Sequence, residues 1–452
     1  MAQLRSLDLD SVFRRLRRNI GLLMTGSGMV ALLGMGTLAF NARALTPAEL
    51  GVLALLEALV LLLAQVFSFD TPQGIIRFGT RALEEQRTDD FRAITALALW
   101  LDGFSSIAAA IATVILVLGF GAAIGLPERL LLPSCAFAAT LLVQFPGTPV
   151  GILRVLDQFK WVTWVSVTQA TLKLCVAAVL FTLDAPVEYY IYGYAASLFA
   201  ANLLRLALAV TQLRRAAGPL RIGRGAGMRS HARPFLRFST GSWLAATLRI
   251  VRQQGTVFII AGLLGPAGAG HFAVAQRIVL PIGYLAELLR QAVYPELARL
   301  AAAGRHADVV RLVKRTVRLT GSGALVFTLL TIALGHWMIA VVAGAGYESA
   351  YWLLVELSVA HALFLCAPFI NDLVILYAGI GRLLSVITSL TVVWAITSPG
   401  AIYLLGLDGA GIGQVVFTAI LMGVSAWIFF THHKRTVQSA PAPAPAPLSE
   451  QD

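Results

Sequence analysis

A run of about 20 apolar residues recurs along this chain, and this repetition constrains the fold more than any other feature. An α-helix needs about 20 predominantly apolar residues to cross the hydrocarbon core of a bilayer. The runs are continuous rather than alternating over about ten residues, which excludes a transmembrane β-barrel. We therefore predict an all-α polytopic membrane protein with about twelve transmembrane helices. The predicted spans are 20–41, 49–69, 93–120, 130–150, 161–183, 189–212, 239–263, 268–293, 319–343, 350–377, 384–405 and 409–431.

The composition of the chain agrees with this class. Hydrophobic residues make up 58% of the 452 residues and charged residues only 13%, against about 25% charged in soluble domains. A soluble globular domain and a disordered chain are both excluded. The net charge of +12 is explained by loop charges that orient membrane spans, so no nucleic-acid partner is expected. Cys135, Cys175 and Cys366 lie in apolar runs and show no metal-ligand spacing, so neither a metal nor another cofactor is expected.

The distribution of Lys and Arg predicts the orientation. Segments on one side of the predicted membrane hold 27 of the 35 basic residues, whereas the loops on the other side hold only Arg43 and Arg129. Cytoplasmic loops of membrane proteins carry this excess of positive charge. An even number of spans with both termini in the cytoplasm is therefore predicted.

A short segment repeats at an offset of 219 residues. LTPAELGVLA at 45–54 and LGPAGAGHFA at 264–273 share Leu, Pro, Ala, Gly and Ala at equivalent positions. Six predicted spans separate the copies, so both halves have the same orientation and are related by an axis along the membrane normal. This pattern predicts two parallel six-helix bundles around a central cleft, which is a transporter architecture.

The predicted organisation follows from the spans and the repeat. The two bundles are joined by a linker that holds seven arginines, which is expected in the cytoplasm. The C-terminal tail contains an alternating Ala-Pro run that cannot form a core, so it is expected to be disordered. The predicted parts are a cytoplasmic N-terminal segment, 1–19, the N-terminal bundle, 20–212, the basic linker, 213–238, the C-terminal bundle, 239–431, and the cytoplasmic tail, 432–452.

Basic residues within the predicted spans indicate a binding site. An Arg or Lys at the centre of a span costs roughly 2.5–3.5 kcal/mol on insertion scales, so it must face a cavity or a partner. Arg249 and Arg252 share one face of the seventh span, and Arg277 reaches a similar depth in the eighth. Guanidinium groups bind phosphate in a bidentate manner. We predict a diphosphate site formed by these arginines, with Lys173 and Arg290 as further candidates.

Internal pairing is the alternative explanation of these charges. Arg249 or Arg252 could pair with Asp102, and Arg277 with Glu57. Arg290 lies three residues after Glu287 and could pair with it.

Acidic residues and a histidine within the spans are candidates for ion coupling. Intramembrane carboxylates and imidazoles are typical of proton relays and of sodium sites. His361 alone is more typical of a satisfied interior imidazole. The candidates are Glu57, Asp102, Glu356, His361 and Asp372.

Two long segments resemble a known family. FNARALTPAELGVLALLEALVLLLAQV followed by PQGIIRFGTR resembles the start of the bacterial polysaccharide (oligosaccharide-lipid) flippases. In that family an R-x-L-x-P-x-x-x-G turn joins the first two spans, here Arg43, Leu45, Pro47 and Gly51. LLGPAGAGHFAVAQRIVLPIGY resembles the repeat in the second half, and the likeness covers residues 15–432.

This resemblance implies an inner-membrane transporter of the multidrug/oligosaccharidyl-lipid/polysaccharide exporter superfamily. Such a protein would move a polyprenyl-diphosphate-linked oligosaccharide, for example an O-antigen or exopolysaccharide unit, from the cytoplasmic to the outer leaflet. The resemblance also implies alternating access, contact with membrane lipid, and polysaccharide polymerase machinery as a partner. A cationic central cavity is a property of the family that the arginines match in type.

Other functions remain as alternatives. A multidrug extruder of the same superfamily usually carries an acidic residue in its first span, and 20–41 contains neither Asp nor Glu. A lipid II flippase usually has fourteen spans, against the twelve predicted here. Enzyme activity is not expected, because the outer loops are short and HExxH, GxSxG and P-loop patterns are missing. A scaffold subunit that moves nothing is a further alternative.

Overall fold

The computed structural model describes residues 9–122, 125–145, 147–218 and 226–439. Within these ranges the side chains of 9–24, 226–231 and 432–439, and a few between 284 and 302 and at 380, are not described. The predicted segment 1–19 and tail 432–452 therefore fall partly outside the description. Across the described ranges the chain forms helices and no strands.

The first bundle comprises the helices that precede residue 218. Its long helices are separated by short helical turns, and the fourth predicted span is divided into α6 and α7. The helices are α1 (Leu9–Ala44), α2 (Pro47–Phe67), α3 (Thr71–Gly74), α4 (Thr80–Glu84), α5 (Thr88–Phe120), α6 (Leu131–Ala139), α7 (Thr148–Val155), α8 (Phe159–Thr182) and α9 (Val187–Ala217).

The second bundle begins with a long helix that supplies two spans. Gly265 has φ 80° and ψ 173°, so the chain of α10 turns there and the two predicted spans lie on separate helical segments on either side. The helices are α10 (Ala226–Ala302), α11 (His306–Val342), α12 (Tyr351–Ala378), α13 (Ile380–Leu405) and α14 (Leu407–Ser439).

The twelve predicted spans lie on these helices, with ends that differ by a few residues. Ten stretches among the described residues are long and apolar enough to cross a membrane, and one of them, 232–283, contains the turn at Gly265. The helix α1 is not among the ten, and part of its predicted span lies where side chains are not described. The prediction of an all-α polytopic membrane protein is confirmed.

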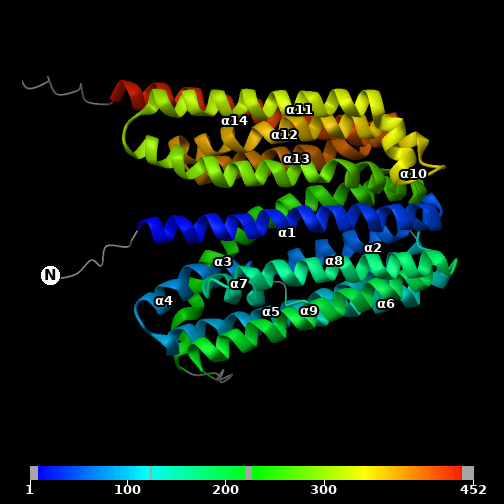
Figure 1. The fold of residues 1–452 in the computed structure, drawn as a ribbon, viewed down its shortest axis with the longest axis horizontal. Coiled ribbons are helices and arrows are strands. Elements are labelled where there is room, and N and C mark those ends of the chain that lie inside the picture. The colour runs from blue at the N-terminus through cyan, green and yellow to red at the C-terminus, as the bar shows by residue number, and fades with distance from the viewer. Residues whose placement is uncertain (1–8, 123–124, 146, 219–225, 440–452) are drawn as a thin grey trace, which may run out of the picture.

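The two bundles lie side by side, and their helices run along the long axis of the molecule (Figure 1). The start of α1 and the end of α14 lie at the same end of the molecule, which we name the terminal end. The opposite end, which holds the connection between α1 and α2, is named the distal end. Helices occupy both sides of the predicted linker 213–238, because α9 continues to Ala217 and α10 begins at Ala226.

The repeated segments cross each other at the distal end. A Cβ atom at Gly51 of α2 would collide with the carbonyl oxygen of Pro266 and touch the backbone nitrogen of Gly270. Reciprocally, a Cβ atom at Gly270 would collide with the carbonyl oxygen of Pro47 and touch the backbone nitrogen of Gly51. The contacts on one helix mirror those on the other, so the pseudo-two-fold axis passes through this crossing.

Further contacts hold the bundles together at the distal end. Nη2 of Arg43 donates to the carbonyl oxygen of Val341 at 2.6 Å, and the hydroxyl of Tyr347 donates to the carbonyl oxygen of Leu45 at 3.4 Å. One hydrophobic cluster combines Leu38 and Leu55 of the first bundle with many residues of the second. The distal end of the cleft between the bundles is therefore closed.

The packing differs toward the terminal end. Two clusters there consist of second-bundle residues around Phe369 and Val374. A third consists of first-bundle residues together with Phe235 of α10, and the indole N–H of Trp243 donates to the carbonyl oxygens of Gln65 and Val66. Among the described residues, the first part of α10 thus packs on the first bundle, while the clusters of α11–α14 remain separate from it. This arrangement leaves the central cleft between the bundles.

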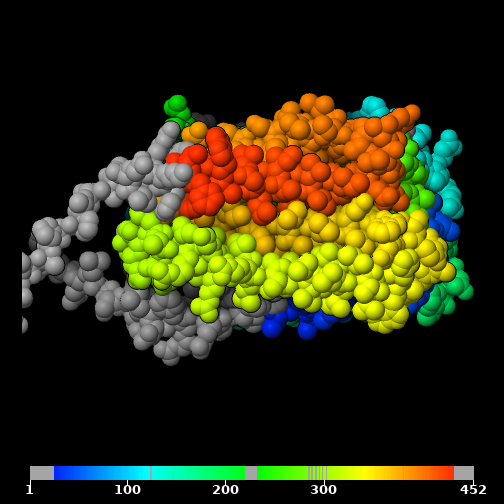
Figure 2. All heavy atoms as spheres, turned by 90° about the horizontal axis from the view of Figure 1, so that it is seen from above, coloured from blue at the N-terminus to red at the C-terminus, as the bar shows by residue number. Residues whose placement is uncertain are grey.

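The outer faces of the bundles carry exposed apolar side chains, as lipid contact requires. Figure 2 shows the face of the second bundle that α11, α12, α13 and α14 cover. Leu319, Trp337, Leu404 and Trp427 on these helices are each more than half exposed.

Candidate functional site

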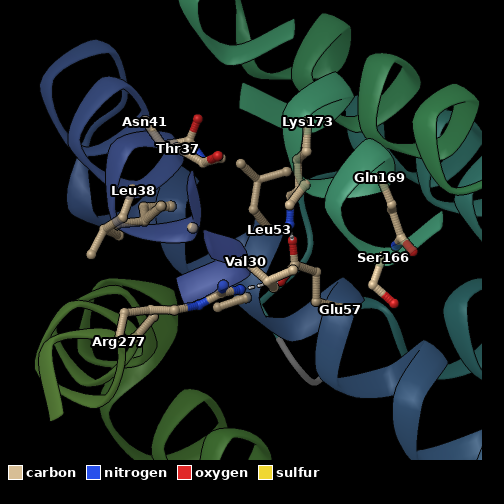
Figure 3. A pocket seen from close by; sticks show the side chains of 15 residues that line it. Val30, Thr37, Leu38, Asn41, Leu53, Glu57, Ser166, Gln169, Lys173 and Arg277 are labelled. Atoms are coloured by element: carbon tan, nitrogen blue, oxygen red, sulfur yellow. Dashed lines mark hydrogen bonds and ion pairs between the residues drawn. The ribbon is translucent and has the colours of Figure 1, made fainter. Parts of the chain in front are cut away.

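A cavity of about 350 Å³ lies at the boundary between the bundles. It is bounded by α1, α2 and α8 of the first bundle and by the second segment of α10 (Figure 3). The equivalent alanines of the sequence repeat, Ala54 and Ala273, both line it. Its polar lining consists of Thr37, Asn41, Glu57, Ser166, Gln169, Lys173 and Arg277.

The charged residues of the cavity share one depth. At 1.5 Å per residue, Glu57 lies about 15 Å from the start of α2 at Pro47, and Arg277 about 16 Å from Pro266. Lys173 lies about 14 Å from the end of α8 at Thr182 by the same rise. These distances are about half the thickness of the hydrocarbon core, which is about 30 Å, so we expect all three charges near the middle of the membrane.

Glu57 contacts both cations of the cavity. Its Oε2 accepts from Nη2 of Arg277 at 2.7 Å, and its Oε1 accepts from Nζ of Lys173. In Figure 3 the Lys173 side chain reaches Glu57 from above and the Arg277 side chain reaches it from the left. The pairing of Arg277 with Glu57 that the sequence offered as an alternative is therefore present.

The ring of Tyr194 packs against Lys173, and the amide of Asn41 in turn holds Tyr194. Nζ of Lys173 lies 4.6 Å from the centroid of the Tyr194 ring, and the Tyr194 hydroxyl donates to Oδ1 of Asn41 at 2.5 Å. A second cavity of about 160 Å³ on this side shares Glu57, Gln169 and Lys173 with the first. Lys173 is thus held within the first bundle and lines both cavities.

The cavity carries a net positive charge. Two cations and one carboxylate give one surplus positive charge in a region from which water is partly excluded. The side chain of Arg277 keeps 40% of its surface exposed, so its guanidinium can reach a further anion. The arrangement suits an anionic group that is small, polar and multiply charged.

Arg252 and Arg249 lie outside this network. Nη1 of Arg252 donates to Oε1 of Gln414 at 3.0 Å, and its guanidinium lies 4.3 Å from the centroid of the Phe417 ring. Arg249 is exposed and makes no hydrogen bond or ion pair with the residues that the structure describes. Neither arginine contacts Asp102, and neither lines the cavity of Arg277.

Asp102 is fully buried and bound by neutral donors. Its Oδ1 accepts from Oγ1 of Thr71 at 2.8 Å, and its Oδ2 accepts from the backbone nitrogens of Gly147 and Thr148 at 3.1 and 2.6 Å. The carboxylate therefore lies at the start of α7, where the fourth predicted span is divided. The N-terminus of a helix stabilises a negative charge in this way.

The remaining candidates lie within the second bundle. Nη1 of Arg290 is 3.4 Å from Oδ1 of Asp372, whereas the side chain of Glu287 lies outside the described residues. His361 Nδ1 is 2.8 Å from the carbonyl oxygen of Leu357, one turn earlier in α12.

Glu356 packs against α14 in the same bundle. A Cβ atom at Gly411 would collide with Oε2 of Glu356, and this buried oxygen has no hydrogen-bond partner within the described part of the chain. Among the described residues, no group of three or more His, Cys, Asp or Glu side chains is placed to hold a metal ion.

Sequence reasoning missed the neutral polar members of the site. Asn41, Gln169 and Tyr194 lie in long apolar runs, and their position within a span is the signal that could have identified them. Tyr194 and Asn41, which are joined by a hydrogen bond, lie 153 residues apart in the sequence, so only the fold brings them together.

Comparison with solved structures identifies proteins of similar fold. Its fold is similar to an inward-facing multidrug resistance MATE family transporter of the MOP superfamily, with a TM-score of 0.72, 15% identity and coverage of 91% and 96% of the two chains. A MOP superfamily transporter from Pyrococcus furiosus, described as having a binding pocket of reverse polarity, gives a TM-score of 0.62, 14% identity and coverage of 94% and 95%.

Sequence comparison agrees with the fold. The inner membrane protein YghQ of Escherichia coli is 26% identical over 356 residues, which cover 76% of this chain and 97% of the relative. The family described as polysaccharide biosynthesis protein matches residues 16–301. The chain shares the fold of these membrane transporters, and it belongs to the polysaccharide biosynthesis protein family.

Proposed function

We propose that this protein is a flippase that moves a polyprenyl-diphosphate-linked oligosaccharide from the cytoplasmic to the outer leaflet by alternating access. The observation that carries the proposal is the cationic cavity formed by Arg277, Lys173 and Glu57 between the bundles at mid-membrane depth. Membership of a polysaccharide biosynthesis family supports the same substrate class.

The physical problem of this transport is the charge of the diphosphate. An isolated ionised group in an apolar medium costs tens of kcal/mol in the Born limit. A cavity with surplus positive charge, midway between the two leaflets, offsets this cost where it is greatest. A volume of about 350 Å³ is typical of sites for small ligands, about 300–1,000 Å³, so the cavity suits the diphosphate end, while the lipid tail stays in the bilayer.

The location and partners follow from this proposal. The protein would lie in the bacterial inner membrane with both termini cytoplasmic, and the central cleft would open toward the cytoplasm. It would deliver its substrate to polysaccharide polymerase machinery on the outer side.

Flipping of a labelled lipid by purified protein in liposomes tests the proposal. Arg277→Ala should lower the rate at which a fluorescent polyprenyl-diphosphate sugar becomes protected from an external quencher. A charge-assisted hydrogen bond is worth about 1.5–3 kcal/mol, so the loss should be about 10- to 100-fold.

Arg311→Ala is the matched control, because Arg311 is an exposed cation outside the cavity whose partner is Asp308. Wild-type flipping by Arg277→Ala would contradict the proposed site. Transport of a cationic drug with no flipping of the labelled lipid would favour the multidrug alternative, and flipping restricted to lipid II would favour the peptidoglycan alternative.

A further inference from the structure

The ion pair between Arg277 and Glu57 joins the two bundles. Among the ion pairs formed between described residues, it is the only one that joins the first bundle to the second. The other cross-bundle polar contacts named above, at Arg43, Tyr347 and Trp243, lie near the two ends, whereas the hydrophobic cluster of Leu38 and Leu55 reaches the depth of the cavity. A charged connection between the bundles therefore exists at the depth of the cavity itself.

Glu57 is also the only acidic residue that lines this cavity among the described residues. Its two oxygens are divided between two cations, one from each bundle. A substrate phosphate that enters the cavity therefore meets a carboxylate already bound to the cations it needs.

The two cations differ in how firmly they are held. Lys173 belongs to the same bundle as Glu57 and is supported by the Tyr194 ring, and 24% of its side chain is exposed. Arg277 comes from the other bundle, and 40% of its side chain is exposed. Its guanidinium faces Gly34 of α1, where a Cβ atom would make an ordinary van der Waals contact with Nη1 of Arg277 at 3.8 Å.

We propose that Glu57 takes the place of the substrate phosphate in the empty transporter and latches the two bundles together through Arg277. A diphosphate displaces Glu57 from Arg277, which releases the latch and allows the bundles to move. This inference rests on the proposed diphosphate site and adds to it the residue that couples binding to movement.

The exchange leaves no isolated charge in the membrane. Carboxylate and phosphate both bind guanidinium in a planar, bidentate manner, so they compete for Arg277. After displacement Glu57 remains paired with Lys173, and Arg277 is paired with the phosphate. A ligand shifts a conformational equilibrium only through its different affinity for the two states, and the exchange of one anion for another supplies that difference.

Binding of farnesyl diphosphate to the protein in lipid nanodiscs tests the competition. Glu57→Gln removes the competing charge and should tighten binding roughly twofold to fivefold, the effect of losing a partly exposed ion pair. Glu57→Asp, whose shorter side chain withdraws from Arg277, should give a smaller gain. Arg277→Ala should bind weakly or not at all.

Asp308→Asn is the matched control for this measurement. Asp308 also lies between two cations, Arg305 at 2.7 Å and Arg311 at 3.2 Å, but outside the cavity and within a single bundle. Asp308→Asn changes the net charge by the same amount as Glu57→Gln and should leave binding of farnesyl diphosphate unchanged.

The outcomes separate the latch from the proposed function. Unchanged or weaker binding by both Glu57 variants, together with loss of binding in Arg277→Ala, would overturn the latch and leave the diphosphate site standing. Wild-type binding by Arg277→Ala would overturn the diphosphate site, and the latch with it.

Distances between the bundles test the movement. Spin labels at Glu84 and Ala307, both exposed at the terminal end, can be placed in a background where Cys135, Cys175 and Cys366 are replaced. Glu57→Gln without ligand should shift the distance distribution toward that of the wild type with farnesyl diphosphate. A distribution identical to that of the empty wild type would contradict the latch.

Discussion

At the scale of single residues, substitutions of Asp102 distinguish a structural role from a role in transport. Its carboxylate accepts from one hydroxyl and two backbone N–H groups in a fully buried position. Asp102→Ala leaves these donors without a partner and should cost about 2–4 kcal/mol of stability. Asp102→Asn keeps an oxygen for the backbone donors and should cost much less. Thermal unfolding of the purified variants in detergent measures the difference.

Transport assays on the same two variants complete this prediction. If Asp102 is structural, Asp102→Asn should flip the labelled lipid at nearly the wild-type rate. A stable Asp102→Asn protein with no transport would instead assign Asp102 to ion coupling, as its position within a span first suggested.

The arginines show which property of a residue the sequence predicts and which it does not. The rise per residue predicts depth, and Arg252 and Arg277 do lie at comparable distances from Gly265 along α10. The direction of a side chain around the helix axis depends on the packing of neighbouring helices. Arg252 turns toward α14 and Arg277 toward α2, so similar depth did not place them in one site.

At the scale of elements, the crossing of α2 and α10 determines how closely the bundles approach at the distal end. A Cβ atom at Gly51 would collide with the backbone of Pro266, which cannot move aside as a flexible side chain could. Gly51→Ala should therefore destabilise the protein by about 1–3 kcal/mol, the usual cost of overpacking. The melting temperature in detergent checks this.

Gly262→Ala is the control for the crossing, because Gly262 lies on α10 with open space around it. Alanine favours a helix over glycine by roughly 1 kcal/mol, so this variant should be as stable as the wild type or more stable. Equal melting temperatures for Gly51→Ala and wild type would show that α2 and α10 can move apart at the crossing without loss of stability.

The sequence repeat predicted the relation between the halves, because Pro and Gly at fixed spacing serve the same close approach in both copies. The division of the fourth span was not predicted. Phe145 has a positive φ of 37°, and a Pro-Gly pair follows it, so the helix ends before α7 begins at Thr148. Apolar content alone read 130–150 as one helix, whereas these backbone signals mark two.

At the scale of the whole molecule, the distribution of charge predicts the orientation in the membrane. Of the 35 basic residues, 27 lie in segments assigned to one side, and the start of α1 and the end of α14 share the terminal end. The two basic residues of the distal loops are engaged by the protein: Arg43 with the carbonyl oxygen of Val341, and Arg129 with Glu188 at 3.3 Å. The positive-inside rule therefore predicts a cytoplasmic terminal end.

Cysteine labelling in intact cells tests this orientation. Ala345, exposed in the distal loop between α11 and α12, and Ala307, exposed at the terminal end, are each replaced by Cys in a background without the native cysteines. A membrane-impermeant maleimide should label Ala345→Cys in intact cells and Ala307→Cys only after permeabilisation. The opposite pattern would reverse the orientation, and the cleft would then open away from the compartment in which lipid-linked sugars would be loaded.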